Sequence, residues 1–120
     1  MSKEALDKFG KIIVEQVWDR AINDWEMIVD GRMKSQHAQD VRQTLSSLDA
    51  DQIDAIRKLI PDVINTAMHH FLWTLEQADG IDVAVRTDGE AVPSIKEVSD
   101  GLAGELPGWI SRFSSKPYRP

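Results

Sequence analysis

The chain contains no cysteine among its 120 residues, which excludes disulfides and a thiol nucleophile. Cysteine usage therefore gives no information about the cellular compartment. The chain also lacks an apolar run approaching the ~20 residues that cross a bilayer, and its first residues lack the pattern of a signal peptide. No low-complexity tract or linker divides it. We therefore expect a cytoplasmic protein with no membrane association, folded as a single domain over residues 1–120.

Familiar reaction motifs are also missing. The chain has no glycine-rich phosphate loop and no Gly-x-Ser-x-Gly elbow, and the glycines at 101, 104 and 108 do not follow a predicted strand. Di-metal bundles of the nucleotide-pyrophosphohydrolase type use paired Glu-x-x-Glu turns, and this spacing does not occur. We therefore expect no cofactor and no catalytic residues, which favours a protein that is not an enzyme.

Charge narrows the range of partners. Twenty acidic residues against fourteen basic ones give a formal charge of −6, and between Pro61 and Glu90 only Arg86 is basic. A nucleic acid or an acidic membrane would be repelled by this segment. The composition thus predicts no nucleic-acid partner, and leaves another protein as the expected one.

Helical periodicity dominates the first half of the chain. It predicts a helix from about residue 3 to Asp30, ended by Gly31 in a left-handed conformation. The apolar face of this helix contains Leu6, Ile13, Val17, Ala21 and Ile28, widened by Val14, Trp18 and Trp25. This stripe is wider than one neighbouring helix covers, which favours a homo-oligomer as one alternative.

Capping residues mark the next helices. Ser35 is a candidate N-cap for a peripheral helix over Ser35–Leu48. Asp49 and Gln52 form the pattern of a capping box, which predicts a helix start with Ile53, Ile56, Leu59 and Ile60 facing the core. Pro61 must then kink this helix or begin a new one, which runs to Ala78. The expected core residues of that last segment are Ile64, Ala67, Met68, Phe71 and Leu75.

Beyond Gly80 the pattern changes to alternation. Ile81, Val83 and Val85 share one face and Asp88-Gly89 is a tight-turn dipeptide, so we expect a short β-hairpin over residues 81–93. Ser94 and Glu97 resemble a second capping box, and the later glycines are expected to break the chain before a last short helix at Pro107–Phe113. The predicted fold is mainly α: a bundle of about four main helices with a hairpin and a short C-terminal helix.

The histidines His37, His69 and His70 are the first candidates for chemistry. Adjacent helical residues point ~100° apart, so His69 and His70 cannot bind one ion together without unwinding the helix. Three-histidine bundles such as the DinB-like proteins have two histidines four residues apart, a spacing that is absent here. The sequence predicts no metal site.

One polar face of the predicted helix at 61–78 could bind a partner. Asp62, His69, Trp73 and Glu76 project opposite its core residues, and Trp109 is a further candidate contact if it is exposed. The alternative is a solvated face with Trp73 covered by the C-terminal segment. Asp62 and Glu76 each lie about two turns, ~10 Å, from His69, too far to orient it as a base.

The first helix presents an acidic stripe, formed by Glu15, Asp19, Glu26 and Asp30. Such a stripe is usually a solvated face, and the functional alternative is the docking of a basic partner protein.

Residues 99–114 (SDGLAGELPGWISRFS), together with His69–Glu76, resemble small uncharacterised bacterial helical proteins over about a quarter of the chain. The resemblance contains no catalytic residues and implies a bacterial origin. Small acidic bacterial proteins include immunity proteins and toxin neutralisers, which act by binding. The leading hypothesis is therefore a non-enzymatic protein-binding module of the immunity or inhibitor kind. Two alternatives are a small-molecule binder or hydrolase with His69 or His70 as base, and a structural homodimer.

Overall fold

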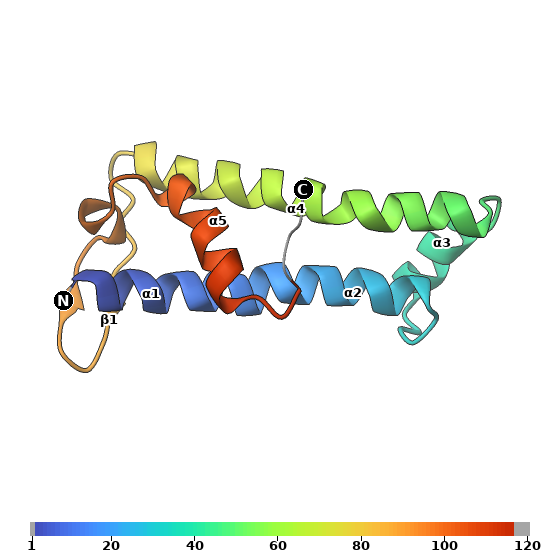
Figure 1. Ribbon diagram of the computed structural model, residues 1–120, viewed down its shortest axis with the longest axis horizontal. Helices are drawn as coiled ribbons and strands as arrows, with labels where there is room; N and C mark the ends of the chain where they lie inside the picture. Colours follow the sequence, from blue (N-terminus) through green and yellow to red (C-terminus); the bar gives the residue numbers. More distant parts are fainter. Residues whose placement is uncertain (1, 117–120) are drawn as a thin grey trace.

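Two long antiparallel helical segments form a hairpin around which the rest of the chain is arranged (Figure 1). The computed structural model describes residues 2–116. The first segment runs without a break through α1 (Ser2–Ile13), the π-helical turn η1 (Val14–Trp18) and α2 (Asp19–Val29). The second is α4 (Ala50–Gln77). The molecule measures 51 × 27 × 27 Å because a helix of 28 residues is itself about 42 Å long.

A short helix closes one end of this hairpin. The first segment ends where Gly31 takes a φ of 85°, as predicted. α3 (Gln36–Leu45) is three residues shorter at its C-terminus than expected, and the Ser35 hydroxyl accepts from the Ala38 amide as its N-cap. Arg42 donates to the Ile28 carbonyl at 3.1 Å, which ties α3 to the last turn of α2.

The start of α4 confirms the predicted capping box. The Asp49 carboxylate accepts from the Gln52 amide at 2.9 Å, and the Gln52 side chain accepts from the Asp49 amide at 3.0 Å. Pro61 lies inside this helix and neither ends it nor begins another. Proline lacks the N–H that would bond to the Arg57 carbonyl, so tertiary packing must offset that loss.

The opposite end of the hairpin is closed by the predicted β-ribbon. β1 (Val85–Arg86) pairs antiparallel with β2 (Ala91–Val92), with Val85 opposite Val92. The prediction of a second capping box at Ser94 and Glu97 was wrong. The Ser94 hydroxyl donates to the Asp82 carboxylate at 2.6 Å. The turn that follows is a 3₁₀ helix, η2 (Ile95–Val98), with no side-chain cap. The Ser94 hydroxyl therefore binds a residue twelve positions away instead of capping the helix that follows it.

The last helix is longer than expected. α5 (Leu102–Phe113) begins five residues before Pro107, so the prediction that the glycines break the chain here was wrong. Gly104, Pro107 and Gly108 are all helical because the opposite side of α5 is buried throughout. That side consists of Leu102, Ala103, Leu106, Trp109 and Ile110.

α5 crosses the hairpin diagonally and fills the space between its two long segments (Figure 1). Trp109, only 1% exposed, lies directly against Gly10 of α1, and its indole meets the Phe9 ring edge-on at 5.9 Å. Val14, Trp18 and other apolar residues of all the long helices join the same core. No helix within residues 2–116 combines the length and the apolarity needed to cross a membrane.

We expect Gly10→Ala to lower the free energy of unfolding by about 1–3 kcal/mol, because a Cβ at this position would overlap the rigid Trp109 indole. Gly104→Ala is the matched control in α5, where a Cβ meets nothing within 4 Å. It should stabilise by up to about 1 kcal/mol through helix propensity. Urea denaturation of both variants measures the difference, and a Gly10→Ala protein as stable as the wild type would contradict the packing described.

Acid should weaken the contact between α5 and α1. The Arg112 guanidinium donates to the Asp7 carboxylate at 3.0 Å and holds the pKa of that carboxyl below its usual 3.8. A lowered carboxyl pKa contributes stability above the unfolded value, and that contribution is lost as the pH falls through the folded value. A double-mutant cycle with Asp7→Asn and Arg112→Gln should thus give a small coupling energy at pH 6 and a smaller one at pH 2. Equal coupling at both pH values would refute this.

Candidate functional site

An apolar groove runs between the first helical segment and α4 on the side that α5 leaves uncovered. It has a volume of about 310 Å³. The lining residues are Ile13, Val17, Ala67, Met68, Phe71 and Leu72. All six are apolar, so the groove offers dispersion and desolvation to a ligand and no hydrogen-bonding side chain.

The rims of the groove come from residues that the sequence placed in the core. Val17 is 45% exposed and Phe71 is 51% exposed, and Ala67 is exposed as well, so these predictions were wrong. α5 packs on one side of the hairpin. Val14 and Leu72 belong to the core that forms there and are buried. Phe71 and Val17 are each next in sequence to a buried residue, Leu72 and Trp18, so each lies roughly 100° further around its helix and is left at the surface.

The width of the apolar stripe was the signal that could have identified this groove. A helix that contacts one neighbour needs an apolar arc of about 100°. α4 carries apolar residues well beyond that arc, including Leu59 and Val63, which are 58% and 64% exposed. We call Val17, Val63, Ala67 and Phe71 the open face. Sequence reasoning noted the excess width on the first helix and missed it on α4.

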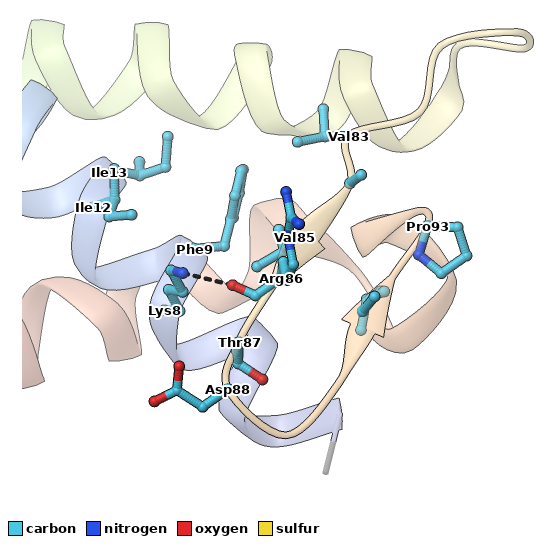
Figure 2. Close-up of a pocket in the computed structure, with 13 residues that line it drawn as sticks. Lys8, Phe9, Ile12, Ile13, Val83, Val85, Arg86, Thr87, Asp88 and Pro93 are labelled. Carbon is cyan, nitrogen blue, oxygen red and sulfur yellow. Dashed lines mark hydrogen bonds between the residues drawn. The ribbon is translucent and has the colours of Figure 1, made fainter.

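A larger hollow continues the groove toward the β-ribbon, and the two share Ile13. It has a volume of about 910 Å³, and Figure 2 shows it between α1 and the ribbon, with Phe9 and Ile12 on one side and Val83 and Val85 on the other. The Lys8 ammonium crosses its edge and donates to the Arg86 carbonyl at 2.5 Å. Apolar side chains therefore continue from the groove into this hollow, whose lining also includes Lys8, Arg86, Thr87 and Asp88.

The polar face predicted on this helix is only partly assembled. His69 and Asp62 are exposed, and Trp73 is 50% exposed, so the C-terminal segment does not cover it. Glu76 is directed toward Gly101 at the start of α5, and its Oε1 is buried without a hydrogen-bond partner. Trp109 is fully within the core and is not available as a surface contact.

The acidic stripe of the first segment binds the chain's own C-terminal residues. The Asp19 carboxylate accepts from the Ser114 hydroxyl at 2.6 Å and from the Ser115 amide at 3.0 Å. Glu26 pairs with the Lys116 ammonium at 3.0 Å, and Asp30 pairs with Arg32 at 2.7 Å. Glu15 is half-buried. Asp19 and Glu26 therefore hold the segment after α5 in place, whereas Asp30 pairs within its own turn.

The histidines do not converge on a common point. The His69 and His70 rings are both exposed on α4, with centroids 5.6 Å apart and planes at 83°. Neighbouring helical positions diverge, which produces this arrangement. Within residues 2–116, no group of three His, Cys, Asp or Glu side chains is placed to hold a metal ion.

No known protein family, curated protein or solved structure matches this chain. The resemblance of residues 99–114 to small bacterial helical proteins stays a prediction. The groove and the open face are therefore the features from which a function is proposed.

Collisional quenching of tryptophan fluorescence should separate the surface from the core. Trp18 and Trp109 are buried and Trp73 is half exposed, so Trp73→Phe should remove most of the emission that acrylamide quenches readily. Trp25, which is half-buried, supplies the smaller remainder. A Trp73→Phe protein quenched as steeply as the wild type would show that the exposed tryptophan is a different one.

Proposed function

We propose that this chain is a non-enzymatic protein-binding module whose groove and open face take up an apolar helix of a partner protein. The observation that carries the proposal is the groove of about 310 Å³ between two packed helices, lined by apolar side chains alone. Exposed apolar surfaces of this kind on a globular domain are typical of interaction sites.

Helix packing explains why a helix fits this surface. Side chains on a helix form ridges that pack into the grooves of a neighbour at an interaxial distance of about 8–10 Å. A groove between two parallel or antiparallel helices can bind a third helix. The bound helix contacts it through apolar side chains spaced three or four residues apart. Val17 and Phe71 form opposite rims, Ala67 lies one turn before Phe71 on the same helix, and the buried Met68 and Leu72 lie between the rims.

The polar groups of the chain support binding rather than catalysis. Asp19 and Glu26 bind residues 114–116, and Glu76 is directed at α5, so these carboxylates serve the fold. An immunity protein or inhibitor is one kind of module that acts by binding alone. The product of the gene immediately upstream is accordingly the first heterologous partner to assay.

Photo-crosslinking in the producing cell tests the proposal even though the partner is unidentified. With p-benzoylphenylalanine in place of Phe71, irradiation should give a covalent adduct of this chain with a protein. The matched control places the same group at position 73, which is equally exposed on the same helix but lies away from the groove. We expect at least a tenfold lower adduct yield there.

Salt provides a second criterion. Contacts in an apolar groove are not screened by ions, so the adduct from position 71 should persist at about 1 M salt. An adduct from position 73 alone would move the binding site to the polar side of α4. The lack of any protein adduct at position 71 would refute the proposed function.

A further inference from the structure

The hollow beside the β-ribbon differs from the groove because its lining includes charged side chains. Of its thirteen lining residues, Lys8 and Arg86 are basic and Asp88 is acidic, which leaves a net charge of +1. The whole chain has a formal charge of −6. Basic charge is therefore concentrated at this hollow against the overall balance, and it favours an anionic group there.

The Arg86 guanidinium is available to bind such a group. Within residues 2–116 it forms no ion pair or hydrogen bond with another side chain, although Asp88 lies two positions further along the chain. Figure 2 shows the Arg86 side chain extending into the space between Phe9 and Val83. A guanidinium presents its N–H donors as a planar fork, and this geometry matches the two oxygens of a carboxylate.

Lys8 places a second cation at the edge of the hollow. Its ammonium has three N–H donors, and the bond to the Arg86 carbonyl uses one of them. That bond holds the ammonium beside the strand that carries the guanidinium (Figure 2). The remaining donors of Lys8 and the fork of Arg86 are thus presented at the same end of the hollow.

An apolar row leads away from these donors. Phe9, Ile13 and Val17 are four residues apart, so they follow one ridge along the first helical segment. Phe9 and Ile13 line the hollow, and Ile13 and Val17 line the groove. For a rise of ~1.5 Å per residue the row is about 12 Å long. A ligand that covers it needs an apolar chain of about that length behind its anionic group.

The available space accommodates such a molecule. The hollow has a volume of about 910 Å³ and the groove one of about 310 Å³. Sites for small molecules typically have ~300–1,000 Å³, with mostly apolar walls and a few polar groups that orient the ligand. Burial of an alkyl chain removes apolar surface from water, and its charged head keeps strong hydrogen bonds to the two cations. A bilayer of anionic lipids fits less well, because it would be repelled by the net negative charge of the chain.

We infer that the hollow and the groove together bind a single-chain anionic amphiphile, such as a free fatty acid. Its head lies at Lys8 and Arg86, and its chain follows Phe9, Ile13 and Val17. This ligand site goes beyond the proposed function and does not depend on it. Because the alkyl chain occupies the groove, the ligand and a partner helix compete for the same surface.

Isothermal titration calorimetry of the purified full chain with decanoate tests the inference. We expect one site with a dissociation constant on the order of 10–100 µM. Decyltrimethylammonium has the same alkyl chain and the opposite charge, and it should bind at least about tenfold more weakly. Saturable binding of decanoate with this preference supports the site.

Variants locate the two ends of the ligand. Arg86→Gln removes the fork and should weaken decanoate binding about tenfold. Arg20→Gln is the matched control, because it removes an exposed charge from the same chain outside both linings, and it should bind decanoate as the wild type does. Val17→Gln places an amide in the apolar row and should weaken decanoate about threefold or more. Because Val17 is 45% exposed, this variant should keep the wild-type circular dichroism.

Several results would overturn the ligand site. They are the lack of saturable heat up to about 1 mM decanoate, equal binding of decyltrimethylammonium, and unchanged decanoate affinity in Arg86→Gln. If Arg86→Gln proves unfolded, Lys8→Gln replaces it, and unchanged affinity there has the same meaning. Co-sedimentation of the chain with phosphatidylglycerol vesicles would also overturn it, because the anionic lipid would then be bound in a bilayer. A protein adduct at position 71 alongside a failed decanoate titration would uphold the proposed function alone.

Discussion

The close contact of Trp109 with Gly10 sets how α5 lies across the two long helices. Only a residue without a Cβ lets the indole lie on the backbone of α1, and that approach places α5 across both long helices. The remaining apolar residues of α5 then meet α4 and the π-helical turn, and Trp18 is enclosed completely. Because α5 occupies one side of the hairpin, the other side is left with apolar side chains and no cover.

Charged side chains also hold α5 and the segment after it against the first helical segment. The segment after α5 is held by Asp19 and Glu26, and Arg112 binds Asp7 at the other edge of the helix. Asp19 and Glu26 belong to the acidic stripe predicted from the sequence, and in the structure they anchor the C-terminal segment. No charged side chain lines the groove, so within residues 2–116 a charged exterior is interrupted by a neutral, apolar surface. That combination is the basis on which binding of an apolar helix is proposed.

Several local features could be predicted because their causes are local. The capping box at Asp49, the N-cap at Ser35 and the left-handed Gly31 each depend on backbone groups within four residues. The hairpin around Asp88-Gly89 also followed from short-range turn chemistry. Ser94 was predicted incorrectly because Asp82, twelve positions earlier, competes for its hydroxyl.

Pattern along the chain was enough to specify a mainly helical protein, the ends of most of its helices and the excess of apolar surface. Which part of that surface is buried follows from tertiary packing. Periodicity identifies an apolar arc on a helix but carries no information about which neighbour covers it, so Val17 and Phe71 could not be told from Val14 and Leu72. The placement of α5 makes that distinction, and it depends on a contact between residues 10 and 109, far apart along the chain.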